Sequence, residues 1–411
     1  MCYAHFASRI PISGSAYTYA YATLGELFAW IIGWDLVLEY AVASSTVAHG
    51  WSHYFVSLLK LFGVQLPSQW ILTPIDFDPG THTWVQTGAY CNLAAGLVVL
   101  LITVILVIGI RESASFNAAM VMLKLAVVVF VIIVGAFYIR PENWHPFLPY
   151  GGSGVLRGAA YIFFAYIGFD SVSTQAEEAR NPQRDVPIGI IASLLLCTVL
   201  YILVAVVLTG MVPFNQIDLE APVARAFATR GLPVAVFLIS VGAVIGITSV
   251  LLVLLLSQAR ILLAMSRDGL ISQRFFAAVH PRFRTPHKAT IVTGILVATV
   301  AAVFPLKILA DLVNIGTLMA FVIVCAAVMV MRRTNPGARR PFRTPFVPVV
   351  PILGMASNLL MMTYLGWENW LRLFVWLGIG LVIYFTYSRR HSKLARALEA
   401  AEARPRRRSR G

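Results

Sequence analysis

Charged residues are scarce in this chain: Asp, Glu, Lys and Arg make up only 12% of its 411 residues, whereas 59% are hydrophobic. A soluble globular domain carries about 25% charged residues, so this composition excludes an ordinary soluble fold. Cysteine is scarce too: the chain has four, and their spacing indicates neither a disulfide framework nor a metal site. The sequence contains no GxSxG, Walker or HExxH motif. We therefore expect a membrane protein that is not an enzyme and needs no cofactor.

Apolar runs recur from one end of the chain to the other. A spanning helix needs about 20 predominantly apolar residues, and ten segments meet or approach that length. Residues 1–11 are interpreted as the last turns of an eleventh helix whose beginning is absent. We predict an all-α polytopic membrane protein with spanning segments at 24–62, 91–110, 118–139, 158–173, 187–211, 232–256, 289–306, 308–331, 347–367 and 370–387.

Basic residues are distributed unevenly between the loops. The net charge of +14 alone would be compatible with nucleic acid binding. When alternate loops are assigned to opposite sides of a membrane, however, one side and the C-terminal tail hold 24 of the 32 Lys and Arg residues. By the positive-inside rule that side is cytoplasmic, so we predict a cell-membrane protein with a cytoplasmic C-terminus and no nucleic acid partner. Residues 1–388 form the predicted transmembrane domain, and 389–411 a solvated basic tail, with anionic lipid contact as the alternative.

Ionisable residues inside apolar segments are unusual because each is costly to place in lipid. Asp35 and Glu39 are four residues apart, hence on one helical face. Glu39 is either a structural carboxyl bonded to a neighbouring helix or a cavity-facing carboxylate that takes protons or contacts a cationic substrate. Lys124 lies roughly 10 Å along its helix. It either extends to the membrane surface or faces the bundle interior, where it would take part in proton transfer.

A break is predicted in the segment that contains Gly168 and Asp170. Glycine weakens a helix interior, and an aspartate just beyond it can cap the helix that resumes there and continues through SVSTQAEE. The upstream half would then end in the unpaired carbonyls of Phe164, Ala165 and Ile167, which favour a cation such as an ammonium group. Broken helices at membrane depth line cavities, and in transporters they form the substrate site.

His49 and His53 have the i, i+4 spacing of a metal-binding helix pair. No carboxylate follows at a fitting position, so we interpret the pair as packing residues near a helix end and expect no metal site. The competing interpretation is an intramembrane metalloenzyme that uses His49, His53 and Glu39.

Two long motifs resemble a known family. Residues 164–190, FAYIGFDSVSTQAEEARNPQRDVPIGI, are similar to the sixth helix and following loop of cationic amino acid transporters, a branch of the amino acid–polyamine–organocation superfamily. Residues 8–40 resemble the connection between the family's second and third helices, and SRDGL with HPRFRTPHKA its eighth-to-ninth connection. The resemblance covers nearly the whole chain. It implies a fold of two inverted five-helix repeats followed by two further helices.

The resemblance also implies roles for individual residues. Substrate contacts would come from the backbone at Phe164, Ala165, Ile167 and Gly168. Lys124 matches the family's fifth-helix lysine, which stands where sodium-coupled relatives hold an ion, and this implies proton coupling. Glu39 and Asp170 match acidic positions of the third and sixth helices that are linked to protonation or substrate coordination.

The resemblance implies secondary active transport of an amino acid together with a proton, by alternating access around the broken sixth helix. Two departures are expected to matter: His5 stands where the family has glutamate, and the first helix with most of the second is missing. Because the missing helix would bind the substrate carboxylate, the alternative is a non-transporting remnant or membrane scaffold. The identity of the amino acid and the oligomeric state are not predicted.

Overall fold

The computed structural model describes residues 1–9, 15–78, 83–109, 114–174, 179–218, 221–334, 336–337 and 341–393. Helices dominate the described chain, which adds one hairpin of β1 (Ile75–Asp78) and β2 (Thr83–Gln86), paired antiparallel. The helices are α1 (Cys2–Arg9), α2 (Ser15–Thr23), α3 (Glu26–Leu61), α4 (Leu93–Ile108), α5 (Ala114–Ala136), α6 (Gly151–Ile162), α7 (Ser171–Thr174), α8 (Pro182–Met211), α9 (Pro222–Ala228), α10 (Pro233–Arg267), α11 (Gln273–Phe276), α12 (His287–Val303), α13 (Leu306–Thr334), α14 (Val349–Tyr364), α15 (Trp367–Ile383) and α16 (Arg389–His391).

The spanning segments predicted from the sequence are helical, as expected. Seven helical stretches of the described chain are long and apolar enough to cross a membrane, and α4, α12 and α14 are shorter apolar helices. The predicted segment 24–62 differs at its start. Gly25 adopts φ +93° between α2 and α3, so the helix begins at Glu26. The predicted tail begins as the helical turn α16, and residues 394–411 lie outside the described residues.

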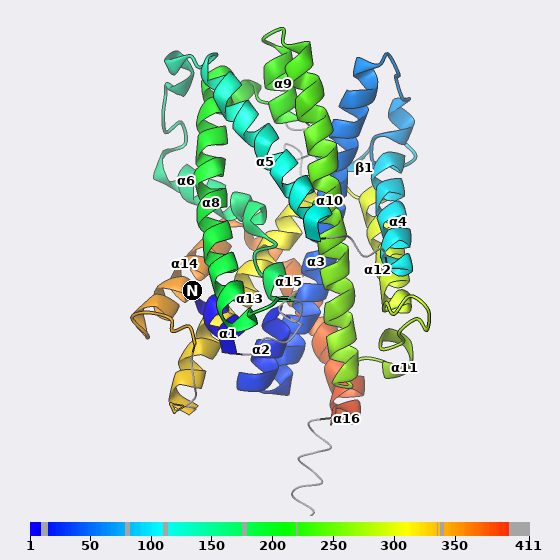
Figure 1. The fold of residues 1–411 in the computed structure, drawn as a ribbon, viewed down its shortest axis with the longest axis vertical. Coiled ribbons are helices and arrows are strands. Elements are labelled where there is room, and N and C mark those ends of the chain that lie inside the picture. Colours follow the sequence, from blue (N-terminus) through cyan, green and yellow to red (C-terminus); the bar gives the residue numbers. More distant parts are fainter. Residues whose placement is uncertain are drawn as a thin grey trace, which may run out of the picture.

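Two long helices form the centre of the bundle. α3 has 36 residues and α10 has 35, and they pack side by side along most of the molecule (Figure 1). Small residues permit this close packing: a Cβ on Gly33 of α3 would lie 2.8 Å from the Tyr17 ring and 2.9 Å from the Met265 sulfur. The remaining helices surround this pair.

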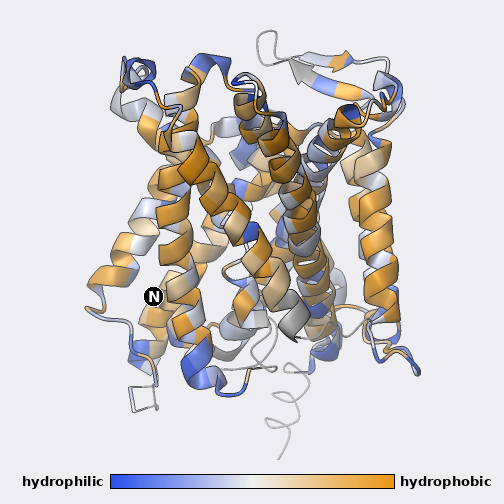
Figure 2. Cartoon of the chain, turned by 45° about the horizontal axis from the view of Figure 1, so that its top comes forward, coloured by the Kyte–Doolittle hydropathy of each residue, from blue (hydrophilic) through white to orange (hydrophobic). Residues whose placement is uncertain are grey.

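The outer surface is apolar at mid-height. Large hydrophobic side chains on the outer helices remain exposed, for example Leu101 of α4 and Leu195 of α8. Figure 2 shows hydrophobic residues along the spanning helices and hydrophilic residues gathered at the two ends. A soluble protein rarely exposes so continuous an apolar surface, so these helices face lipid.

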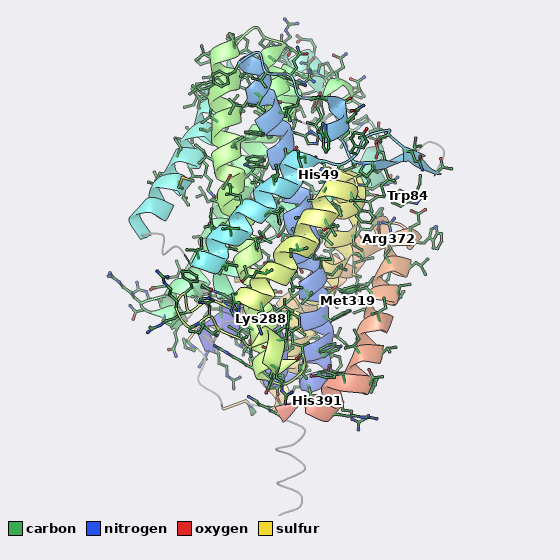
Figure 3. All side chains as sticks on the ribbon, turned by 90° about the vertical axis from the view of Figure 1, so that its right-hand side faces the viewer. His49, Trp84, Lys288, Met319, Arg372 and His391 are labelled. Carbon is green, nitrogen blue, oxygen red and sulfur yellow. The ribbon has the colours of Figure 1, made fainter. Side chains whose placement is uncertain are left out.

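The two ends carry different elements. α11 and α16 lie at one end, at the bottom of Figure 1, whereas α9 lies at the other. Figure 3 shows Lys288 and His391 toward the first end and Trp84, on the hairpin, toward the second. The alternation of loops predicted from the sequence therefore agrees with the fold. We call the end with α11 and α16 the basic end.

The last spanning helix is fixed to α3 by tryptophans. Trp34 and Trp376 stack at 4.5 Å, and each indole N–H donates to the backbone carbonyl of the other residue. Trp30 donates to the Gly380 carbonyl at 2.8 Å. A Cβ on Gly380 would lie 2.4 Å from the Trp34 ring, so the close approach requires glycine there. α15 is thus held rigidly against the centre of the bundle.

Candidate functional site

The predicted break is confirmed. α6 ends at Ile162, a 3₁₀ turn η3 covers Phe163–Tyr166, and Ile167 is extended with φ −61° and ψ 135°. Gly168 then adopts φ +111°, a conformation that residues with a Cβ rarely adopt. α7 resumes at Ser171 and is described as far as Thr174; residues 175–178 of the predicted continuation lie outside the described residues. The break leaves backbone polar groups inside the bundle.

A cavity of about 340 Å³ lies at the break, between α5, α8 and α10. Its wall includes Ala165, Ile167 and Gly168 of the break, together with Lys124 of α5 and Ser249 of α10. Three of the four backbone positions predicted to contact substrate thus line one cavity with the predicted lysine. Phe164 does not belong to the wall, and its side chain packs against the main hydrophobic core.

Lys124 faces the bundle. Its Nζ donates a hydrogen bond of 2.9 Å to Ser249 Oγ, and the side chain is half-buried. The alternative in which this lysine extends to the membrane surface is therefore wrong for this structure. α5 can approach α10 closely because residue 242 is glycine: a Cβ there would lie 2.6 Å from a Val127 methyl.

The prediction of three unpaired carbonyls at the break is wrong for two of them. The Ile167 N–H donates to the Phe164 carbonyl at 3.1 Å, and the Tyr201 hydroxyl donates to the Ala165 carbonyl at 2.7 Å. The 3₁₀ turn explains the first bond, because it closes i to i+3 pairs. Among the described residues, no donor to the Ile167 carbonyl is found, and Ile167 belongs to the cavity wall.

Asp170 connects the break to α3. One carboxylate oxygen accepts from the Tyr40 hydroxyl at 2.6 Å, and the other from the Gly168 N–H at 3.2 Å. Tyr40 also lies 3.0 Å from Ser171 Oγ. Asp170 is buried and stands directly before α7, as predicted, and these two bonds also connect it to Gly168 and to α3. Tyr40 was missed by the sequence analysis, although it directly follows Glu39.

Glu39 and Asp35 lie away from the cavity at the break. Both side chains are 2% exposed on α3. Asp35 packs against α13, where a Cβ on Gly316 would lie 2.7 Å from Asp35 Oδ1. The two carboxyls share a buried face, as their spacing predicted, but neither belongs to the cavity wall. Glu39 thus does not face this cavity, and neither of its carboxyl oxygens has a hydrogen-bond partner among the described residues, so the predicted bond to a neighbouring helix is not seen either.

His49 and His53 pack together. The His49 Nε2 lies 2.9 Å from the Phe304 carbonyl, and Nδ1 lies 3.3 Å from Asn92 Nδ2. The two imidazoles stack at 6.4 Å. Because both ring nitrogens of His49 already have partners, the pair is a packing element. Over the described part of the chain, no group of three His, Cys, Asp or Glu residues could hold a metal ion.

Comparison with known proteins decides the family. The model of the family described as "Amino acid permease" matches residues 1–390. The chain belongs to the amino acid permease family. It is 49% identical to a methylthioribose transporter of Bacillus subtilis (strain 168) over 96% of this chain and 83% of that protein. It is 48% identical to the branched-chain amino acid permease BcaP of the same organism, with the same coverage.

Eukaryotic relatives support the same family. Cationic amino acid transporter 4 of Homo sapiens is 30% identical over 96% of this chain and 80% of its own length. The named relatives are permeases and transporters. This permease is accordingly an all-α, multi-pass membrane protein of amino acid transport, not an enzyme. The intramembrane metalloenzyme interpretation is wrong.

Proposed function

We propose that this permease carries out proton-coupled secondary active transport of a neutral, apolar amino acid by alternating access around the broken helix α6–α7. The observation that carries the proposal is the cavity at the break, whose wall includes both Lys124 and Ile167, the residue whose carbonyl has no donor among the described residues. A carbonyl at the end of a helix has partial negative charge, and we assign it to the substrate ammonium. Phe164, Ala165 and Gly168 hold the backbone that presents this carbonyl.

The composition of the wall supports a neutral side chain. Aliphatic side chains form a large part of the wall, with Val172, Leu194 and Val250 among them. Among the described residues that line the cavity, Lys124 carries the charge. No carboxylate is among them to pair with a cationic side chain. A lysine or arginine substrate would therefore bring a second positive charge beside Lys124 without compensation. The relative BcaP is named a branched-chain amino acid permease, which supports an apolar side chain.

A second candidate substrate follows from the other relative. The protein that is 49% identical is named a methylthioribose transporter. Hydroxyl groups of Ser171, Ser193, Tyr201 and Ser249 belong to the same wall and would suit a small neutral sugar thioether. In both candidate substrates, the group that would lie against the aliphatic residues is uncharged: the side chain of the amino acid, or the thioether of methylthioribose.

Three ionisable residues are proposed to carry the proton coupling. Lys124 faces the cavity and bonds to a neutral hydroxyl, so it can exchange a proton without breaking an ion pair. Asp170 adjoins the break through Gly168. Glu39 directly precedes Tyr40, the hydroxyl donor to Asp170. Protonation in this group would alter the bonds that hold the break, which connects proton binding to the substrate site.

A second cavity supports a path toward the basic end. It has a volume of about 370 Å³ and shares Gly168, Ser171 and Val172 with the first. Its wall continues to Asp185 in the first turn of α8. Release toward this end, which we propose to be cytoplasmic, would pass directly from the break into this second cavity.

The substrate proposal is tested by counterflow in proteoliposomes. Vesicles that contain the full chain are loaded with unlabelled leucine, and uptake of labelled leucine is measured with competitors outside. We expect saturable exchange that isoleucine and valine inhibit and that lysine and arginine leave unchanged. Inhibition by methylthioribose alone would favour the second candidate. Exchange that requires a cationic amino acid would contradict the assignment of the cavity.

The proposed topology is tested by cysteine labelling in intact cells. In a background without Cys2, Cys91, Cys197 and Cys325, a cysteine replaces either Trp84 or Lys288, which are both exposed and lie toward opposite ends (Figure 3). We expect a membrane-impermeant reagent to label Trp84→Cys at once, and Lys288→Cys only after permeabilisation. The reverse order would contradict a cytoplasmic basic end.

A further inference from the structure

A polar pocket at the basic end lies apart from the site at the break. Its volume is about 360 Å³, and Ser272, Gln273, Arg274, Tyr387 and His391 line it together with Gly269 and Ile271. These residues come from two segments. One directly follows α10, and the other ends the last spanning stretch, Trp367–His391. Figure 3 shows His391 at this end of the molecule.

Backbone contacts fix the two walls of this pocket against each other. Ser388 Oγ donates to the Leu270 carbonyl at 2.7 Å, and the Lys393 N–H donates to the Asp268 carbonyl at 3.0 Å. Gly269 adopts φ +87°, and a Cβ there would lie 2.4 Å from the His391 carbonyl oxygen. The pocket is therefore built by a close approach of two distant parts of the sequence, and its shape does not depend on exposed side chains alone.

The polar groups of the wall favour an anion. Arg274 supplies a guanidinium, with donors arranged to meet two oxygens of a phosphate at once. The Ser272 hydroxyl adds a neutral donor, and the Gln273 amide nitrogen, which donates one N–H to the Arg267 carbonyl at 3.5 Å, carries a second N–H. His391 Nδ1 lies 2.9 Å from the Tyr387 carbonyl, so that nitrogen donates within the helix and Nε2 is the ring's other polar atom.

Nearby carboxylates are directed elsewhere. Asp268 accepts from the Tyr17 hydroxyl at 2.6 Å, and Glu26 accepts from the hydroxyls of Tyr384 and Ser392. Neither carboxylate belongs to the wall of the pocket. The wall thus combines positive charge and neutral donors, and both acidic residues beside it already have partners.

We propose that this pocket binds the phosphate-bearing headgroup of an anionic phospholipid. We choose a lipid over a soluble anion because of where the pocket lies along the membrane normal. Both walls begin where a spanning helix ends, and such positions lie at the level of the headgroups. Tyr387 stacks on His391 with ring centroids 4.2 Å apart, and tyrosine is enriched at this level of the membrane. Basic pockets between spanning helices are suited to anionic headgroups.

The test measures lipid binding by the full chain in neutral detergent micelles. Fluorescent phosphatidylglycerol is titrated onto the protein, with phosphatidylcholine of the same acyl chains as the neutral lipid. We expect phosphatidylglycerol to bind at least tenfold more tightly, and Arg274→Gln to weaken it by about tenfold, which corresponds to about 1.4 kcal/mol. His391→Gln is a second variant, with a smaller expected loss. Gel filtration and thermal melting verify that each variant is folded.

Arg333→Gln is the matched control, because it removes one exposed positive charge at the end of α13, outside the pocket. Phosphatidylglycerol binding should be unchanged in this variant. An equal loss in Arg333→Gln and Arg274→Gln would show diffuse charge attraction and overturn the proposal. Equal affinity for the two lipids would also overturn it. Displacement of the lipid by inorganic phosphate at the same concentration would assign the pocket to a soluble anion instead.

Discussion

Lys124→Ala is expected to abolish proton-driven accumulation of substrate while leaving substrate exchange in place. A difference of one pH unit supplies about 1.4 kcal/mol for each proton, enough for a gradient of up to about tenfold when one proton accompanies each substrate. Lys124 supplies the basic side chain of the cavity wall, and its Nζ donates a hydrogen bond to Ser249 Oγ. Without it, the substrate should only equilibrate. Uptake into proteoliposomes with an imposed pH difference measures the accumulated ratio.

Two variants separate a proton-transfer role from a structural one. Lys124→Arg keeps the positive charge and the hydrogen-bond donors, but arginine does not release its proton in proteins. We expect this variant to lose accumulation as well, whereas a purely structural lysine would be rescued. Lys60→Ala is the control: it removes an exposed lysine in the last turn of α3, outside the cavity wall, and should behave like the wild type. Full accumulation in Lys124→Ala across the pH range would remove this lysine from the mechanism.

Gly168→Ala should disrupt the break itself. A Cβ at this position would meet no atom within 4 Å, so the substitution acts through the backbone and not through a clash. At φ +111° a non-glycine residue is strained by about 1–3 kcal/mol. That cost shifts the chain toward a continuous helix and lowers the ratio of the broken to the continuous form by roughly 5-fold to 150-fold. We expect the rate of leucine exchange to fall within that range.

Gly158→Ala is the matched control for this experiment. Gly158 lies in α6, and a Cβ there would also meet no atom within 4 Å, but its φ is not positive. Alanine in a helix interior is better than glycine by about 0.5–1 kcal/mol. The control should therefore transport normally with unchanged or higher thermal stability. If both variants lost activity equally, flexibility of the whole segment would matter, and the left-handed conformation of Gly168 would not.

Features with a local cause were predictable from the sequence. Apolar length determined the spanning helices, because no other backbone structure satisfies its own hydrogen bonds in lipid without closing a barrel. The break could be predicted as well, since Gly168 and Asp170 stand together in an apolar run and both act on the neighbouring backbone. The start of α3 was placed two residues early because the sequence did not reveal that Gly25 adopts a positive φ and separates α2 from α3.

Features that depend on distant contacts could not be predicted from the sequence. The orientation of Lys124 was open until Ser249, 125 residues away in the sequence, provided its acceptor. Two hydroxyls changed the account of the break. Tyr201 donates to the Ala165 carbonyl from 36 residues downstream, and Tyr40 donates to Asp170 from 130 residues upstream. A tyrosine in an apolar helix carries no signal of which backbone group its hydroxyl will reach.

The central claim is that this permease couples amino acid uptake to protons at the broken helix. Its most direct test is leucine accumulation in sodium-free proteoliposomes with an acidic exterior. The account predicts accumulation above equilibrium that a protonophore abolishes, together with alkalinisation of the exterior as leucine enters. Leucine uptake that stops at equilibrium under the pH difference, or that accumulates only when sodium is supplied, would contradict it.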